Sequence, residues 1–413
     1  MAIILPFKAV RPAAHYAHLV ASRSVDGYSI QDLNEKLAGN PYTFLHVINP
    51  DFEQSTKTKP GSPERLIRTR NQYSNFKNEQ ILIKEKKLCY YVYKQTKLDR
   101  SYVGLIACCS VDDYFNGVIK VHEQTLTERE EKLMEYLDVC EFNAEPVLFS
   151  YKDNKIINAI IASVQKGVHT YDFMTTDKVR HSLWLIDDKI RVEKIKKEFE
   201  KCNAIYIADG HHRSASSALL ASRRRAVSKK RKNTDSYNFY LGALFPESQL
   251  KIYDFNRIIK DLGNLSAADF LSAISESFNV KKHVSKIYRP KKKGEIAMYL
   301  DKYWYSLTCK KLAAKQLNPA DELDASILTK TILSPILCIH DLKTDKRVGF
   351  VNGTKGMEEL KKQVDIGKAA VAFALFPVTM NEIKLIADTH SIMPPKTTYV
   401  EPKLRSGLVI YEF

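Results

Sequence analysis

The sequence predicts an α+β fold, and three observations lead to that prediction. Short runs rich in β-branched and aromatic residues, typical of strands, alternate with stretches whose apolar residues recur at helical spacing. The chain has 413 residues, more than one hydrophobic core usually holds, so two or three domains are expected. Hydrophobic residues make up 44% and charged residues 27%, which is the composition of a soluble globular protein.

Residues 1–100 form the first predicted region, which is of the α/β type. Within it, residues 29–39 are predicted to form a helix that ends at Gly39. The charged stretch 50–73 contains Gly, Pro and Ser and has little periodicity, so we expect an irregular surface segment there. The β-branched and aromatic run at 86–95 predicts a strand.

Residues 101–253 form the second predicted region, and residues 254–413 form the third, an α+β domain. A strand-like run at 102–111 opens the second region. The pattern then changes to a helix-like run at 267–278, which places a boundary near Tyr253.

The N-terminus and the cysteines indicate the compartment. No run of about 18 apolar residues is present to span a bilayer, and the first residues lack the basic start and the longer apolar block of a secretory signal. Seven scattered cysteines, none spaced as C-x-x-C, favour reduced thiols over a disulfide framework or a zinc knuckle. We therefore expect a cytoplasmic protein that does not contact a membrane.

The formal net charge is +16, and part of it is concentrated in the basic block, residues 222–233 (SRRRAVSKKRKN). Two interpretations stay open. The block is expected to be a solvated loop whose like charges repel, and the alternative is a contact with nucleic acid phosphates. The remaining positive charge is spread thinly, which suits small anionic substrates such as nucleotides as well as it suits anionic polymers.

The stretch 204–222 (AIYIADGHHRSASSALLAS) joins a strand-like run to a helix predicted to begin at about Arg213. Free N–H groups at a helix N-terminus can hold a phosphate, and the helix dipole adds to the attraction. Gly210 permits a close backbone approach, Arg213 offers a planar fork, and Ser214 and Ser216 add hydroxyl donors. The alternative is an Asp-Gly turn followed by a polar helix cap.

Asp209 ends the predicted strand of this stretch. Its carboxylate can accept a proton from an attacking hydroxyl or hold a magnesium ion. His211 and His212 are adjacent and point in different directions, so they make a poor metal pair. A zinc site would need distant ligands such as His122 or His181.

A second group of candidate residues lies in 117–137 (GVIKVHEQTLTEREEKLMEYL). Thr125 and Glu128 have the spacing of a capping box, so a helix is predicted to begin just after Thr125. His122 and Glu123 then lie between a strand and a helix. If this strand neighbours the strand that ends at Asp209, two acids lie beside a phosphate site, which is the minimum equipment for phosphoryl transfer.

These motifs resemble those of known proteins. The segment IADGHHR resembles the D-G-H-H-R motif of free serine kinases, which belong to the ParB/sulfiredoxin-like superfamily, and HEQTLTERE resembles their upstream H-E-Q segment. A wider resemblance, carried by PFKAVRP, FLHVINP, NAEPVLF and MPPKTTYVEPKLRSGL, links nearly the whole chain to a large bacterial and archaeal family described as a domain of unknown function.

The resemblance implies a ParB/sulfiredoxin-like nucleotide-binding domain over residues 101–253, flanked by the N-terminal α/β and C-terminal α+β regions. It implies that the catalytic residues are His122, Glu123 and Asp209. It also implies that nucleotide and phosphate are bound by Gly210, His211, His212, Arg213 and Ser214. It also implies that the strand ends at 143–147 and 180–186 lie near a site. His211 replaces the sulfiredoxin cysteine, which argues against that reductase activity. The longer spacing between Glu123 and Asp209 implies insertions that reshape the substrate pocket.

The C-terminal stretch 391–408 adds three candidate cations, Lys396, Lys403 and Arg405, beside the stiff Pro394-Pro395 pair. A rigid basic loop of this kind would close over nucleotide phosphates or a substrate carboxylate. The alternative is a surface connection with its charges in water.

Taken with the resemblance, these residues predict magnesium-dependent phosphoryl transfer from ATP or ADP to the hydroxyl of free serine or a similar small metabolite. The alternative is a non-enzymatic, nucleotide-responsive regulator that contacts nucleic acid through the basic block. The oligomeric state stays open.

Overall fold

A computed structural model describes residues 1–228, 232–284, 287–310 and 318–413. The chain forms two compact units, the first of residues 1–121, 125–250 and 402–413, and the second of residues 122–124 and 251–401. This division differs from the three predicted regions. No boundary separates 1–100 from 101–253, because a continuous antiparallel ladder joins β4 (Tyr90–Lys97) to β5 (Arg100–Ser110).

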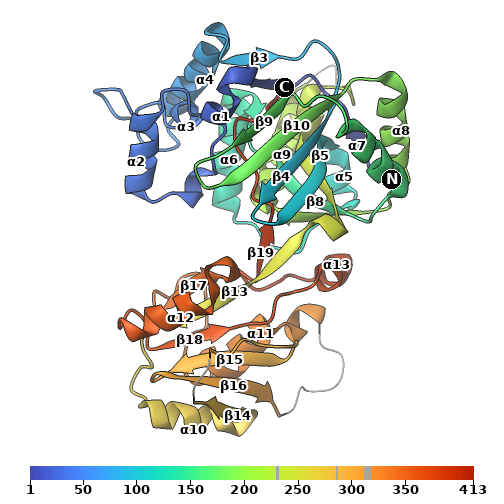
Figure 1. Cartoon of the computed structure of the whole chain (residues 1–413). Helices are drawn as coiled ribbons and strands as arrows, with labels where there is room; N and C mark the ends of the chain where they lie inside the picture. The colour runs from blue at the N-terminus through green and yellow to red at the C-terminus, as the bar shows by residue number, and fades with distance from the viewer. Residues whose placement is uncertain (229–231, 285–286, 311–317) are drawn as a thin grey trace. The chain divides into compact units, whose positions relative to one another are not determined.

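The first unit is built on a mixed sheet (Figure 1), whose strand order in the described residues is β6-β11-β8-β12-β5-β4-β10-β9, with β1 also paired to β5. The pairs β6–β11 and β8–β12 are parallel, and the other pairs are antiparallel. The remaining strands are β1 (Ile4–Leu5), β6 (Ile119–Lys120), β8 (Val147–Tyr151), β9 (Tyr171–Met174), β10 (Val179–Ile186), β11 (Ile205–Asp209) and β12 (Phe239–Pro246).

Two small two-stranded sheets complete the strands of this unit. One pairs β2 (Val10–Pro12) with β3 (Leu82–Lys84), and the other pairs β7 (Phe142–Asn143) with β20 (Tyr411–Glu412). The second pairing returns the C-terminal segment 402–413 to the first unit, whereas the prediction placed it in a C-terminal domain.

The helices of the first unit bury their apolar faces against the large sheet and against each other. Phe199 of α8 and Ala218 of α9 share one core with Phe149 of the sheet, and Leu220 of α9 packs on Met134 of α6. The helices are α1 (Ala17–Val20), α2 (Ile30–Gly39), α3 (Leu45–Ile48), α4 (Pro63–Asn78), α5 (Val111–Phe115), α6 (Thr127–Cys140), α7 (Lys155–Val164), α8 (Lys189–Glu200) and α9 (His211–Val227).

Helix α2 ends at Gly39 as predicted, and it begins after a capping box between Ser29 and Asp32. The expected irregular segment 50–73 differs from the structure, because α4 begins within it at Pro63. Ser62 caps this helix, and Leu66, Tyr73 and Phe76 bury one of its faces. The helical spacing of these apolar residues is hard to recognise in the sequence, because a long polar stretch precedes Pro63.

The second unit has a sheet of strand order β14-β16-β15-β18-β13-β17, with β19 also paired to β13. Its strands are β13 (Lys251–Ile259), β14 (Phe278–His283), β15 (Glu295–Leu300), β16 (Tyr303–Cys309), β17 (Val348–Asn352), β18 (Val371–Ala374) and β19 (Thr398–Glu401). Its helices are α10 (Ala267–Ser277), α11 (Asp324–Leu328), which continues into the π-helix η6 (Thr329–Leu333), α12 (Gly356–Asp365) and α13 (Met380–Asp388).

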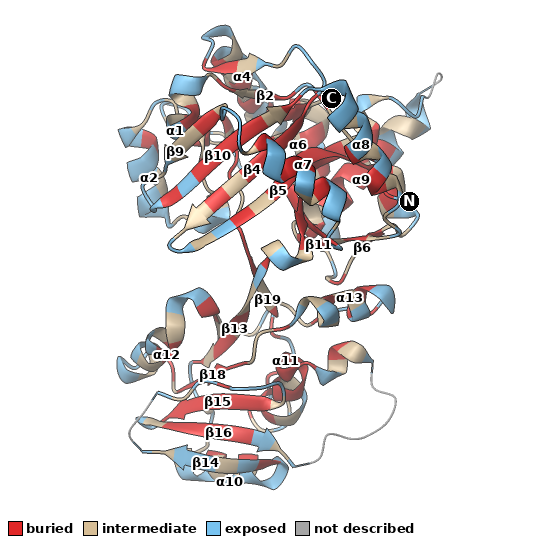
Figure 2. Cartoon of the chain, turned by 45° about the vertical axis from the view of Figure 1, so that its right-hand side comes forward, coloured by how far each residue is buried: buried red, intermediate tan, exposed pale blue. Residues whose placement is uncertain are grey.

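Side chains pack against both faces of this second sheet. Strand β15 is therefore buried along its length, as its colour in Figure 2 shows. Phe270 of α10 packs with Met298 on one face, called here the α10 face, and Leu360 of α12 packs with Tyr299 on the other, the α12 face. Alternate residues of a strand point to opposite faces, which explains why neighbouring residues of β15 belong to different cores.

The state of the cysteines and the length of the helices bear on the expectations drawn from the sequence. All seven cysteines are free thiols, and Cys338 is the exposed one. None of the helices in the described parts of the chain combines the length and the apolar character needed to cross a bilayer.

Candidate functional site

The strand-to-helix hinge, residues 205–213, has the predicted form. Strand β11 ends at Asp209, Gly210 follows with φ +103°, and α9 begins at His211, two residues before the predicted start. A side chain at position 210 would be strained at this φ, and its Cβ would lie 3.0 Å from the Arg213 guanidinium. Glycine is therefore required at the point where the backbone turns.

The backbone N–H groups in the first turn of α9 are of the kind that can bind an anion. In an α-helix the first N–H groups find no carbonyl earlier in the same helix, and the dipole makes this end positive. Gly210 carries no side chain that would cap these groups. A phosphate placed here would meet the amides and the positive end of a 17-residue helix.

Asp209 lies between two cations. Its Oδ2 is 3.1 Å from Nη2 of Arg213, and its Oδ1 is 2.9 Å from Nζ of Lys403. Burial alone would raise the pKa of Asp209, but Lys403 and then Arg213 lower it to about 2. The carboxylate is therefore ionised at neutral pH, and its low basicity makes it a poor proton acceptor.

Arg213 has a second acidic partner that the sequence did not predict as a site residue. Its Nη1 lies 3.1 Å from Oε1 of Glu145 and also donates to the carbonyl of Pro146. Both residues belong to the segment 143–147, which the resemblance placed near a site. Two carboxylates thus hold the guanidinium beside the start of α9.

Arg405 differs from the prediction of a basic loop. It is buried, its Nη2 contacts both oxygens of Asp177 at 2.7 and 2.8 Å, and its Nε donates to Nε2 of His181 at 3.2 Å. Nδ1 of His181 lies 2.8 Å from the hydroxyl of Tyr93. Arg405 is committed to this internal network, so it fixes the first unit and does not reach for a phosphate.

His181 is held neutral by the same network. Burial, and then the charge of Arg405, lower the pKa of His181 to about 3. Both of its ring nitrogens have protein partners. His181 therefore has no ring nitrogen left to serve as the distant zinc ligand considered from the sequence.

Lys396 belongs to a different unit of the chain from Lys403 and Arg405. It belongs to the second unit, where its Nζ lies 5.9 Å from the centre of the Phe255 ring and its carbonyl accepts a bond of 2.9 Å from Arg257. Lys403 belongs to the first unit, and its carbonyl accepts from Nε2 of Gln95 at 2.8 Å. Within the first unit, Lys403 is the predicted cation that contacts Asp209 of the hinge.

The strand that precedes His122 is a neighbour of the strand that ends at Asp209, as the prediction requires. Strand β6 pairs in parallel with β11, with Ile119 opposite Ile205. His122 is buried and its carbonyl accepts from the N–H of Met393 at 2.9 Å within the second unit. The pairing of Glu123 with Asp209 stays a prediction.

The predicted capping box at Thr125 is not formed. Helix α6 begins at Thr127, with Leu126 at its N-cap and no side-chain bond there. Glu128 bonds Lys132 at 2.6 Å, one helical turn later, so it does not reach back to Thr125.

The first half of the basic block also differs from the expected loop, because α9 continues to Val227. Arg224 bonds Asp138 of α6 at 2.9 Å, and Arg225 bonds Asp112 at 2.6 Å. These arginines attach α9 to its neighbours. Residues 229–231 of the block lie outside the described residues.

No cluster of three His, Cys, Asp or Glu side chains suited to a metal is found among the residues with a described placement. Asp209 offers carboxylate oxygens, which are the ligands magnesium prefers. A magnesium ion here would take its other ligands from nucleotide phosphates and water, and Asp209 would hold it.

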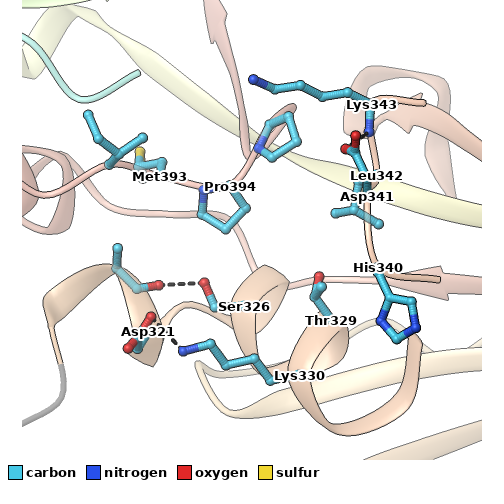
Figure 3. A pocket seen from close by; sticks show the side chains of 13 residues that line it. Asp321, Ser326, Thr329, Lys330, His340, Asp341, Leu342, Lys343, Met393 and Pro394 are labelled. Carbon is cyan, nitrogen blue, oxygen red and sulfur yellow. Dashed lines mark hydrogen bonds and ion pairs between the residues drawn. The ribbon is translucent and has the colours of Figure 1, made fainter. Parts of the chain in front are cut away.

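A separate pocket of about 300 Å³ lies in the second unit. Met393 and Pro394 lie across it from Thr329 and Lys330 (Figure 3), and Lys330 is paired with Asp321 at 2.8 Å.

The fold and the hinge define a mixed α and β protein in which a strand ending at Asp209 meets the N-terminus of a helix. The family model described as "Protein of unknown function (DUF1015)" matches residues 4–326, and the chain belongs to this family. The search of curated proteins found no match to this chain.

Several solved structures are similar to the chain at low identity. A free serine kinase in complex with AMP has a TM-score of 0.38 and 12% identity, over 73% of this chain and 91% of that chain. A mutant free serine kinase in complex with ADP has a TM-score of 0.40 and 13% identity, over 76% and 96%. SbnI with a C-terminal truncation, from Staphylococcus aureus, has a TM-score of 0.37 and 12% identity, over 73% and 85%.

Proposed function

We propose that this protein binds ATP or ADP at the start of α9 and transfers a phosphoryl group to the hydroxyl of a small amino acid such as free serine. One observation carries the proposal: the ionised carboxylate of Asp209 lies between Arg213 and Lys403 at the uncapped, positive end of a long helix. Phosphoryl transfer depends on positioning and on charge stabilisation, and this arrangement supplies both.

The cations and the helix bind the phosphates. Arg213 and Lys403 each have a carboxylate partner in the absence of nucleotide, and a phosphate would compete with Asp209 for both. The N–H groups of His211 and His212 would add donors to the same anion. Ser214 is buried in the first turn and supports the helix start.

The two acids have different tasks in this proposal. Because its pKa is low, Asp209 holds magnesium or orients the acceptor hydroxyl and does not remove its proton. Glu123 is the general base, and His122, next to it on the chain, sets its position. The ParB/sulfiredoxin-like assignment of residues 101–253 is part of the same proposal.

The direct experiment measures O-phosphoserine formed from serine with ATP or with ADP, in the presence and absence of magnesium. Product from one donor, lost with chelator, supports the proposal. Nucleotide binding without product from serine or related hydroxy amino acids would contradict the transfer step.

The alternative, a non-enzymatic nucleotide-responsive regulator, is favoured by one feature of the hinge. A nucleotide would displace two ion pairs at once, and Lys403 connects the hinge to the C-terminal segment of the first unit. Nucleotide-dependent changes in hydrogen exchange at 402–413, without turnover, would support this function over the kinase.

A further inference from the structure

The second unit contains a concentration of positive charge that the hinge does not use. Residues 281–293 (KKHVSKIYRPKKK) include seven lysines and arginines and no acid. The segment runs from the end of β14 toward the start of β15. Strand β14 is the edge strand of its sheet in the described residues, with β16 as its neighbour.

Two aromatic rings lie at the centre of this segment. His283 stacks on Tyr288 with the ring centres 3.9 Å apart and the planes 15° apart. His283 also bonds the hydroxyl of Ser306 at 3.0 Å. Both rings are partly exposed, so the stacked pair forms a fixed aromatic surface at the edge of the sheet.

Glu295 holds this arrangement in place. Its Oε1 accepts from the Tyr288 hydroxyl at 2.6 Å, and its Oε2 accepts from the backbone N–H of Lys291 at 2.7 Å. Both oxygens of the single nearby acid are therefore engaged with the loop itself. The acid fixes the rings and does not pair with a lysine side chain.

Three exposed lysines of this segment, Lys281, Lys291 and Lys292, are called the lysine patch, and Nζ of Lys291 lies 5.9 Å from the centre of the Tyr288 ring. The pKa of His283 is lowered, first by burial and then by the charges of Lys281 and Lys291, while Glu295 opposes this shift. Within the described residues, no carboxylate lies in ion-pair distance of the three ammonium groups. Lys293 is different, since it pairs with Glu382 at 2.8 Å.

The register of β14 places Lys281 and His283 on one face of the sheet. Lys281 is opposite Ser306 and His283 is opposite Trp304, which packs in the α12 core. Lys282 is on the α10 face, where its Nζ lies 3.3 Å from the centre of the Tyr303 ring. The stacked aromatic pair thus has Lys281 on its own face of the sheet, and Glu295, the acid beside it, is engaged with Tyr288 and the backbone of Lys291.

We propose that the lysine patch and the His283–Tyr288 pair bind single-stranded nucleic acid. Exposed cations without partners suit a phosphate backbone, and aromatic faces stack on unpaired bases of any sequence. An acidic peptide would use the lysines but gain little from the rings, and a duplex keeps its bases stacked internally. The site is distinct from the hinge and does not depend on the proposed kinase activity.

The test titrates the full chain against a fluorescent 15-nucleotide oligo(U) at several salt concentrations. The variant K281Q/K291Q/K292Q should bind roughly 100-fold more weakly at 0.1 M salt, and its salt slope should fall by about 2, since each single-strand phosphate contact contributes about 0.7. Y288A should weaken binding about tenfold, because stacking on the ring is lost, while Y288F keeps the ring and should stay within about twofold.

The matched control removes three exposed lysines from α8 in the variant K189Q/K194Q/K197Q, with the same change of net charge. This control should bind the oligonucleotide like wild type, and the patch variant should bind mononucleotide like wild type in calorimetry. Equal losses in both triple variants would show a non-specific charge effect and overturn the proposal. Equal affinity for polyglutamate, for a duplex or for phosphatidylserine vesicles, or no loss in Y288A, would also overturn it.

Discussion

Nη2 of Arg213 lies 3.1 Å from Oδ2 of Asp209, across the turn at which β11 becomes α9. The same carboxylate contacts Lys403, which is 194 residues further along the chain. One acid therefore organises a local cation and a distant one at a helix N-terminus. This relationship determines what the hinge can bind and how its variants should behave.

Replacing Arg213 should weaken nucleotide binding. The Arg213→Ala change removes a bidentate phosphate donor, and a charge-assisted hydrogen bond contributes about 1.5 to 3 kcal/mol, so the affinity for ADP should fall about 10- to 150-fold. Isothermal titration calorimetry measures this loss. Arg223→Ala is the control, because Arg223 is an exposed arginine of the same helix, 3.9 Å from Asp138. Equal affinity in both variants would remove the phosphate site from the hinge.

Arg225 should contribute to stability, contrary to the expectation that the basic block is a solvated loop. Its side chain is 11% exposed and bonds both Asp112 and Asn238 at 2.6 Å. Arg225→Ala leaves these groups without their partner and should lower the free energy of unfolding by about 1 to 3 kcal/mol. Urea denaturation measures the change. Arg223→Ala should change it by less than about 0.5 kcal/mol, because an exposed pair contributes little.

The stability of the protein should fall on acidification through His181. The pKa of His181 is about 3 in the folded protein, below the ordinary 6.5. Between these two pH values the imidazole is protonated in the unfolded chain and neutral in the folded protein. The free energy of unfolding should therefore fall from pH 6.5 toward pH 3, by up to about 1.4 kcal/mol per pH unit. In His181→Gln this contribution is absent and the slope is smaller. An unchanged slope would show that His181 does not titrate in this way.

The hinge could be predicted from the sequence because its determinants are local. An apolar run that ends in Asp209 and Gly210, followed by small helix-forming residues, specifies a strand, a turn and a helix within a few positions. The helix start was misplaced by two residues because His211 and His212 were not counted as helical. Element boundaries depend on the hydrogen bonds that the first turn makes.

The partners of the hinge could not be predicted in the same way. The contacts of Asp209 with Lys403 and of Arg213 with Glu145 join segments that the sheet topology brings together, and no local pattern encodes them. The buried position of Arg405 has the same cause, because its partner Asp177 is 228 residues away along the chain and no local pattern encodes the contact. Helix α4 did leave a local signal, Ser62 followed by Pro63, which is typical of a helix start.

The proposed roles of the two acids are tested by variants that keep shape and remove charge. Glu123→Gln should reduce the rate of phosphoserine formation by about 10²- to 10⁴-fold, the usual contribution of a general base, and Asp209→Asn should reduce it by a similar factor because it weakens the hold on magnesium or on the acceptor hydroxyl. Residues that act as one unit are not additive, so the double variant should be scarcely slower than the slower single variant. Calorimetry with ADP checks that binding survives.

The two variants should differ in how they respond to magnesium. If Asp209 holds the metal, Asp209→Asn should need more magnesium for half-maximal rate, whereas Glu123→Gln should keep the wild-type requirement and lose rate at every magnesium concentration. The pH profile separates them further, because the ionisation of a general base limits the rate at low pH and Glu123→Gln should lack that limb. Wild-type rates in both single variants would remove these residues from the chemistry, and with them the structural reason to assign phosphoryl transfer to this site.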